Sequence, residues 1–280
     1  MYLPRDLPNA SVLITVKTYP LPSVKYTELV CTAGLVDGEK WIRVYPISAD
    51  LLKSSARVPK YSWVRMNLRR KESDFRPESY SPVLGVDEPI DIVSHIDTAN
   101  AWASRRALVE REVFDSMEDL IALAKRQPPK SLGTIRPKEI VDLEIEPTSD
   151  QWKDEWLAQS NQGYMFALDE DRNPRRRGQV RKLPFNYYFR FATRGDTSLR
   201  RLMVTDWEIG ALFWKCVEQT GGDQYAANEL VRQKYLSEIA GKCDVLFFLG
   251  TTKAYHRRSR NPFLIVGVFY PPRNPQMTLL

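Results

Sequence analysis

Histidine and cysteine are scarce in this chain of 280 residues, which has two histidines and three cysteines. The cysteines, Cys31, Cys216 and Cys243, lie far apart within apolar stretches, and their odd number favours free, buried thiols in a reducing cytosol over a disulfide framework. No cysteine or histidine pair, including His95 and His256, has the spacing of a structural zinc site. The phosphate-binding patterns GxxxxGK[ST] and GxGxxG are also absent. We therefore predict neither a metal nor a bound cofactor.

Long apolar runs are missing as well. No segment approaches the roughly 18 apolar residues that a transmembrane helix needs, and the N-terminal letters MYLPRDLPNA lack the pattern of a secretory signal. What is present is 43% hydrophobic and 27% charged residues, with 41 Lys+Arg against 35 Asp+Glu and a net charge of +6. We expect a soluble, globular, cytoplasmic protein without a membrane partner, whose basic balance suits an acidic partner such as nucleic acid.

The first part of the chain is predicted to be β-rich. Apolar residues alternate over 11–17 and again over 61–70, with the period of strands that bury one face. The pair Asp37-Gly38 separates two apolar runs, and these residue types favour a type I′ turn because both central positions need a positive φ. Four short strands within residues 11–70 predict a small barrel or curved sheet.

Residues 98–127 are predicted to form two helical pieces, the second capped at Ser116 and Asp119. The alternating segment 138–147 is interpreted as a strand that returns to the first sheet. These features place residues 1–147 in a β-rich module with a helical insertion.

Residues 148–280 are predicted to form a second, α+β module. A hairpin around Arg194-Gly195-Asp196 is followed by a capping box over 205–208, a helix that ends at Gly221-Gly222, and a second helix over 223–240. Two continuously apolar strands, DVLFFLG and FLIVGVFY, indicate that both of their faces are covered. The fold class of the whole chain is therefore α+β.

Aromatic and cationic side chains share strand faces in the first module. Trp41, Arg43 and Tyr45 lie on one side of their strand because residues two apart point the same way. Rings stack on bases and cations hold phosphates, so such a face suits single-stranded nucleic acid. Three basic clusters, at 69–71, 172–182 and 253–260, add cations that can contact phosphate. The candidate interface comprises Lys17, Tyr19, Trp41, Arg43, Tyr45, Trp63, Arg65, Arg69, Arg175, Arg176, Arg177, Arg181, Lys182, Lys253, His256, Arg257 and Arg258.

Structural roles offer the alternative interpretation. The rings would then pack under the helices at 98–127 while the arginine stems extend over them to water, and the charge runs would be ordinary solvated loops.

Catalytic groups are few, and no acid-x-lysine pair lies on an apolar strand. The trio Asp142, Glu144 and Glu146 shares a strand face and either holds a cation or forms a solvent-facing edge. His256, in a loop interpreted as exposed, is a candidate general base that its cationic neighbours would keep neutral. The polar segment 74–78 is a candidate pocket wall.

The leading hypothesis is therefore a protein that binds DNA or RNA without chemistry of its own, as an accessory or subunit of a larger assembly that includes other protein subunits. A phosphodiesterase or nuclease and a scaffold for an acidic protein partner are the alternatives.

Overall fold

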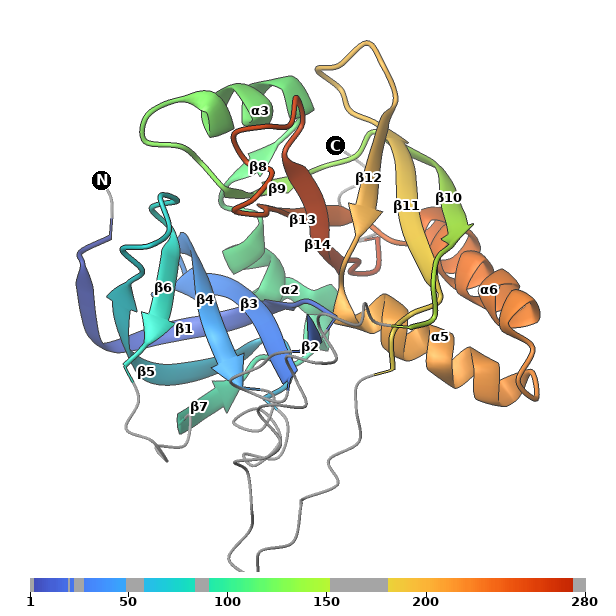
Figure 1. Cartoon of the computed structure of the whole chain (residues 1–280), viewed down its shortest axis with the longest axis horizontal. Helices are drawn as coiled ribbons and strands as arrows, with labels where there is room; N and C mark the ends of the chain where they lie inside the picture. The colour runs from blue at the N-terminus through green and yellow to red at the C-terminus, as the bar shows by residue number, and fades with distance from the viewer. Residues whose placement is uncertain are drawn as a thin grey trace, which may run out of the picture.

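Two β-sheets and the helices packed on them make up the computed structural model (Figure 1). The structure describes residues 3–19, 21–22, 28–48, 58–83, 91–151 and 181–273. Within these ranges, no helix is both long and apolar enough to cross a membrane.

The first sheet closes into a five-stranded barrel in the order β1-β3-β4-β6-β5, with β5 pairing back onto β1. Its strands are β1 (Asp6–Lys17), β3 (Glu28–Val36), β4 (Lys40–Ser48), β5 (Ser62–Arg70) and β6 (Ser79–Pro82). Two further strands, β2 (Leu21–Pro22) and β7 (Asp91–His95), pair with β3 and β5. The predicted β-rich N-terminal module is confirmed, and it is a barrel.

The turn between β3 and β4 is the predicted one. Asp37 and Gly38 have φ values of 51° and 71°, and the amide of Glu39 donates to the carbonyl of Val36 at 3.0 Å. Positive φ at both central residues is the requirement of a type I′ turn, which asparagine, aspartate and glycine meet most easily.

Two helices follow the barrel, α2 (Ala99–Val109) and α3 (Met117–Lys125). The predicted cap of the second is confirmed, because the Ser116 side chain accepts a hydrogen bond from the amide of Asp119 at 3.2 Å. The helical insertion therefore forms where the sequence places it.

The second sheet has the order β10-β11-β12-β14-β13-β9-β8. Its strands are β8 (Val113–Phe114), β9 (Leu132–Ile135), β10 (Glu139–Pro147), β11 (Phe185–Ala192), β12 (Arg200–Val204), β13 (Leu246–Thr251) and β14 (Phe263–Phe269). The strand predicted over 138–147 exists as β10, but its assignment to the first sheet is wrong, because β10 pairs with β11. The change of sheet thus falls between β7 and β8, while the domain boundary at 147/148 stays a prediction.

The hairpin of β11 and β12 leads into α5 (Trp207–Gln219), which is followed by α6 (Gln224–Gln233) and its π-helical continuation η1 (Lys234–Ala240). The capping residue of α5 differs from the prediction. Asp206, not Thr205, is the N-cap, and its side chain accepts from the amide of Glu208 at 3.2 Å. The Thr205 hydroxyl instead donates to the carbonyl of Ile265 at 3.3 Å, because Thr205 still follows the path of β12 beside β14.

The second sheet lies between the barrel and the helices α3, α5 and α6, whereas α2 packs on the barrel side (Figure 1). Phe247 and Leu249 of β13 face a core shared with α3, α5 and α6. Leu246 and Phe248, which alternate with them, face a second core that includes Trp41 on the outside of the barrel. This arrangement confirms that both faces of the last two strands are covered, and it brings the barrel wall and the second sheet together around a cavity.

Candidate functional site

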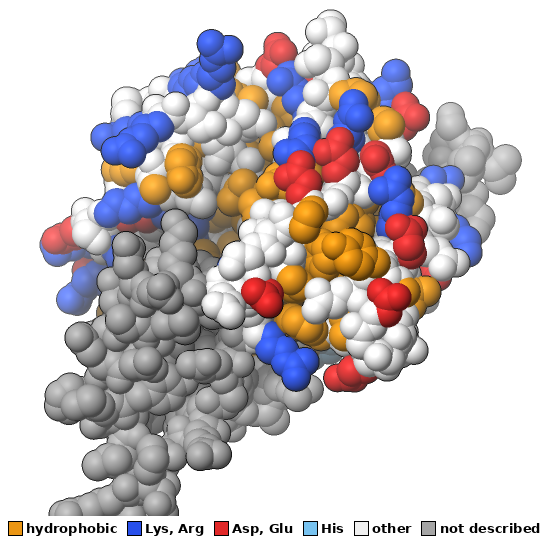
Figure 2. Space-filling model, turned by 45° about the vertical axis from the view of Figure 1, so that its right-hand side comes forward, with side chains coloured by type: hydrophobic (Ala, Val, Ile, Leu, Met, Phe, Trp, Pro, Cys, Tyr) orange, Lys and Arg blue, Asp and Glu red, His pale blue; other side chains and the backbone are white. Residues whose placement is uncertain are grey.

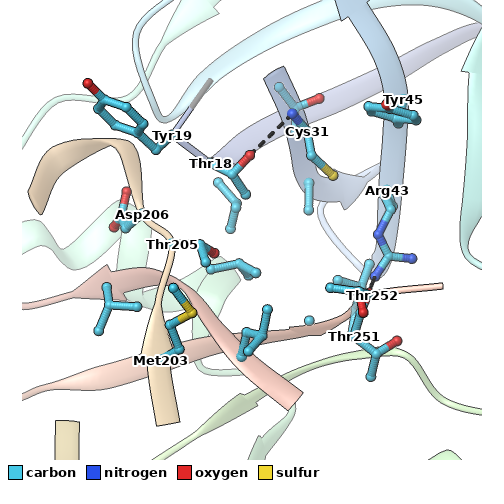
Figure 3. A pocket seen from close by; sticks show the side chains of 18 of the residues that line it. Thr18, Tyr19, Cys31, Arg43, Tyr45, Met203, Thr205, Asp206, Thr251 and Thr252 are labelled. Carbon is cyan, nitrogen blue, oxygen red and sulfur yellow. Dashed lines mark hydrogen bonds between the residues drawn. The ribbon is translucent and has the colours of Figure 1, made fainter. Parts of the chain in front are cut away.

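A cavity of about 540 Å³ lies between the barrel wall and the second sheet. Residues of β1, β3 and β4 form one side, and residues of β11 to β14 form the other. Figure 3 shows the Cys31 thiol and the Arg43 guanidinium on the barrel side, with Thr251 and Thr252 opposite them. We call this space the inter-sheet cavity.

A buried ion pair forms part of its polar end. Arg76 Nε donates to Asp74 Oδ1 at 2.9 Å, and Arg76 Nη2 donates to Asp74 Oδ2 at 2.5 Å. Arg76 also donates to the carbonyl of Thr251 in the second sheet. Burial alone would raise the pKa of the Asp74 carboxyl, but the hydrogen bonds and charge of Arg76 outweigh it and lower this pKa to about 2. The segment predicted to line a pocket does so.

Arg43 crosses from the barrel to the second sheet. Its Nη1 donates to the hydroxyls of Ser79 and Ser131, both at 3.1 Å, and its Nη2 donates to the carbonyls of Ser131 and Thr251, both at 3.3 Å. The carboxylate of Glu78 accepts from the amide and hydroxyl of the same Ser131, at 2.9 and 2.8 Å. Because Nη1 and Nη2 of Arg43 already have partners in both sheets, Arg43 holds the two sheets together.

The Cys31 thiol faces the cavity close to Arg43. Burial raises the pKa of this thiol, and the positive charges of Arg43 and Arg76 only partly oppose that rise. Cys31 is therefore a neutral thiol at neutral pH rather than an activated nucleophile. All three cysteines are free.

A second buried cluster joins the two sheets at the other end of the cavity. Lys60 Nζ contacts both carboxylate oxygens of Asp206, at 2.7 and 3.0 Å, and Glu208 Oε2 at 3.3 Å. Burial alone would lower the pKa of Lys60, but the two carboxylates raise it overall. The fully buried Asp206 also accepts from the amide of Val268 at 3.0 Å. This cluster thus fixes α5 and β14 against the barrel.

The segment between β13 and β14, residues 252–262, is the basic loop. Its centre is fixed by His256, which is 4% exposed. The Nε2 atom lies 2.9 Å from the carbonyl oxygen of Ala124 and therefore donates, while Nδ1 lies 2.7 Å from the Thr251 hydroxyl and accepts. Burial lowers the pKa of His256, so the ring is neutral. The expectation of an exposed His256 is wrong, because the ring anchors the loop to the end of α3.

Around this buried anchor the loop presents cations and one aromatic ring to solvent. Tyr255 is 64% exposed, and the Arg257 guanidinium lies 4.0 Å from the centre of the Phe75 ring. Thr252 and Lys253, which begin the loop, also line the inter-sheet cavity. The loop therefore borders the cavity mouth.

The cations of the basic loop form no ion pairs within the described part of the chain. Lys253, Arg257, Arg258 and Arg260 form no ion pair with any carboxylate of the described residues, and the same holds for Lys125 and Arg126 at the end of α3. Several surface arginines elsewhere are paired with carboxylates, as in Arg201 with Glu144 at 2.6 Å. Figure 2 shows that acidic and basic side chains are interleaved on the right of this view, whereas basic side chains without adjacent acidic ones lie at the upper left.

The predicted aromatic face of β4 exists, but much of it is buried. The Trp41 ring packs edge-on against Phe248 with centroids 5.2 Å apart, and Arg43 is 5% exposed. Trp63 is half-buried and packs against the core between the sheets. For these side chains the structure favours the structural alternative, since Trp41 packs against β13 and the same core includes Leu108 and Val109 of α2.

Four further predicted residues line or border the inter-sheet cavity. Tyr19 and Tyr45 are both in its wall, and Tyr19 accepts from the indole of Trp214 at 2.8 Å. Lys182 lines it as well, whereas Arg181 is exposed and lies 5.2 Å from the Trp214 ring.

The remaining predicted residues lie away from the cavity or outside the described residues. Lys17 donates to the carbonyl of Val58, and burial together with the charge of Lys60 lowers its pKa to about 8. Arg65 is exposed on β5, and Arg69 pairs with Asp6 at 2.6 Å. The predicted cluster Arg175, Arg176 and Arg177 lies outside the described residues.

The acidic trio of β10 forms a solvent-facing edge paired with arginines. Glu144 contacts Arg201 at 2.6 Å, Glu146 pairs with the same Arg201, and Asp142 contacts Arg232 at 2.5 Å. No group of three or more potential metal-ligating side chains occurs in the part of the chain that the structure describes.

Sequence reasoning missed Tyr255, Lys125, Arg126 and Asn186, which line the cavity or belong to the exposed basic surface. The only signal for Tyr255 was its position among cations in TTKAYHRRSR. Asn186 carries no signal, because its place opposite β4 depends on the pairing of two distant sheets.

Two family models match the chain. Residues 8–111 match one described as a domain of unknown function, DUF8758, and residues 113–280 match one described as a domain of unknown function, DUF8757. The comparison with curated proteins finds no match. The two matches meet between α2 and β8, where the chain passes from the barrel sheet to the second sheet.

Proposed function

Because the chain belongs to the family described as a domain of unknown function, DUF8757, we propose from its own residues that it binds single-stranded nucleic acid through the basic loop. In this proposal it does so without chemistry of its own, as an accessory of a larger assembly in the cytoplasm. The three free thiols are compatible with that compartment.

One observation carries the proposal: cations with no ion-pair partner among the described residues surround an exposed tyrosine on a loop with a fixed centre. Lys253, Arg257 and Arg258 have no carboxylate partner among the described residues, so phosphates need not displace one. Tyr255 offers a ring on which a base can stack. Because His256 holds the loop from within, ordering it on binding costs little entropy.

The phosphodiesterase alternative receives no support from its named groups. Both ring nitrogens of His256 are engaged and the ring is buried, so a substrate has no access to a free base there. The carboxylates Glu144 and Glu146 are engaged by Arg201.

The test is a titration of labelled single-stranded DNA and RNA oligonucleotides at several salt concentrations. With about four phosphates engaged, the slope of log K against log salt should be about −3. Replacing Lys253, Arg257 and Arg258 together by glutamine should reduce that slope by about 2 and weaken binding. Tyr255→Ala should weaken binding about tenfold at unchanged slope.

A matched variant carries Arg5→Gln, Arg190→Gln and Lys234→Gln. It removes the same number of exposed positive charges, but each of these cations is paired with a carboxylate. It should bind as the wild type does. Equal loss in both triple variants would show that net charge alone drives binding, and absence of binding to either nucleic acid at low salt would overturn the proposal.

A further inference from the structure

The inter-sheet cavity has a volume and a lining that suit one ligand the basic loop would deliver. We propose that it takes a single unstacked base of the bound strand, whose phosphates remain on the cations at its mouth. This inference rests on the proposed function and adds a recognition site to it.

The cavity and the basic loop are continuous. Thr252 and Lys253 belong to both, and Lys253 is exposed. Lys71 lines the cavity too, with its ammonium 4.7 Å from the centre of the Tyr45 ring and in no ion pair with a described carboxylate. A strand lying on the loop therefore passes the cavity entrance between Lys253 and Lys71. There a phosphate can pair with these cations while the attached base turns into the cavity.

The interior is largely apolar and of suitable size. Apolar side chains such as Leu264 and Val266 of β14 line it together with the Tyr45 ring. A volume of about 540 Å³ is within the range of small-molecule sites, which are mostly apolar with a few polar groups. Proteins that extrude a base hold it in this kind of environment, between aromatic or apolar side chains.

Two polar groups in the wall are available to a base edge. The Asn186 amide and the Tyr45 hydroxyl line the cavity and have no hydrogen-bond partner among the described residues. An asparagine amide offers both a donor and an acceptor, and a phenol can do either. Arg43 and Arg76 already donate to neighbouring groups, so they shape the polar end and leave base recognition to Asn186 and Tyr45.

The deciding experiment compares two oligonucleotides of equal length, one with bases and one with an abasic sugar at every position. Both keep the phosphates, so both should show the same salt slope if the basic loop binds them. The Tyr255→Ala variant removes stacking on that ring. In this variant the base-bearing strand should still bind about tenfold more tightly than the abasic strand. Only the base-bearing strand should slow alkylation of the Cys31 thiol, which lines the cavity. The reference thiol is Cys243, which is half-buried and lies outside the cavity.

Filling the cavity provides the second measurement. Met203 lines it (Figure 3), so Met203→Trp should remove the affinity difference between the two strands and leave the salt slope intact. Leu199→Trp, at an exposed position outside the cavity, is the matched control and should keep the difference. Asn186→Leu should also lower the affinity for the base-bearing strand and so reduce its difference from the abasic strand.

The outcomes separate the two proposals. Equal affinity for both strands in the Tyr255→Ala background, or an affinity difference that survives Met203→Trp, overturns the cavity assignment and leaves binding by the basic loop standing. If neither strand binds, the proposed function fails and the cavity assignment fails with it.

Discussion

Asp74 and Arg76 illustrate how a pair of side chains two residues apart becomes a structural unit. Both side chains are almost fully buried, at 6% and 7% exposure, and Arg76 also reaches Thr251 of the second sheet. Removing one partner leaves a buried, unpaired charge and therefore lowers the free energy of unfolding strongly, whereas the intact pair adds little net stability.

Asp74→Asn should therefore lower the free energy of unfolding by about 3 kcal/mol at neutral pH, because it leaves Arg76 buried without a counter-charge. The pKa of Asp74 is lowered to about 2 in the native state, below its value in the unfolded chain. The carboxylate thus contributes stability above about pH 4 and loses it as the pH falls through about 2. Denaturant unfolding of both proteins should show the gap shrinking by about 2 kcal/mol between about pH 5 and pH 2.

Asp6→Asn is the matched control. Asp6 also pairs with an arginine, Arg69, but the two side chains are 54% and 58% exposed. Surface pairs contribute little, so this change should cost under about 1 kcal/mol. A gap for Asp74→Asn that stays constant down to pH 2 would contradict the role given to Arg76.

At the scale of elements, α3 depends on two acceptors at its N-terminus that come from different parts of the chain. Ser116 accepts from the amide of Asp119. Asp196, in the β11–β12 turn, accepts from the amides of Met117 and Glu118 at 3.1 and 3.3 Å. Burial alone would raise the pKa of Asp196, but its hydrogen bonds lower it overall. The helix and the hairpin therefore stabilise each other.

Ser116→Ala should cost about 1 kcal/mol, as the loss of an N-cap usually does, and Asp196→Ala should cost more because it also removes a charge from the positive end of the helix. Thermal or denaturant unfolding measures both changes. Ser73→Ala, at an exposed serine that caps no helix, is the control and should be neutral within about 0.5 kcal/mol. Equal effects of Ser116→Ala and Ser73→Ala would contradict the capping role.

At the scale of the whole molecule, the barrel and the second sheet each have a core of their own and share a third one between them. Trp41 packs on Phe248, Arg43 donates to Thr251, and the Lys60 ammonium is held by Asp206. Apolar packing and buried charges both cross the junction, so unfolding of either sheet exposes the core that the two sheets share.

Unfolding of the full chain should therefore be a single transition, with far-ultraviolet circular dichroism and tryptophan fluorescence giving coincident curves. Trp41→Ala should keep a single transition but lower the free energy of unfolding by about 3–5 kcal/mol, because it empties a large buried volume between the sheets. Tyr255→Ala, which truncates an exposed ring, should leave it within about 0.5 kcal/mol. Two separate transitions in the wild type would show that the sheets are independent.

Local features were predictable because short-range physics sets them. The Asp37-Gly38 turn needs only two residues that accept positive φ, and the Ser116 cap needs one side chain near one amide. The alternation in β5 likewise predicts that Val64, Met66 and Leu68 face inward. These interactions span a few residues, so the sequence alone determined them.

The tertiary structure decided which strand joins which sheet and which polar groups are covered. β10 pairs with β11 because its partner is chosen by long-range packing, which period-two alternation does not encode. His256 and Arg43 are polar in sequence yet buried, because hydroxyls and carbonyls from distant segments satisfy their donors. The sequence by itself determined the strands, the Asp37-Gly38 turn, the Ser116 cap and the basic loop. The inter-sheet cavity exists only because two sheets from separate stretches of chain pack against each other.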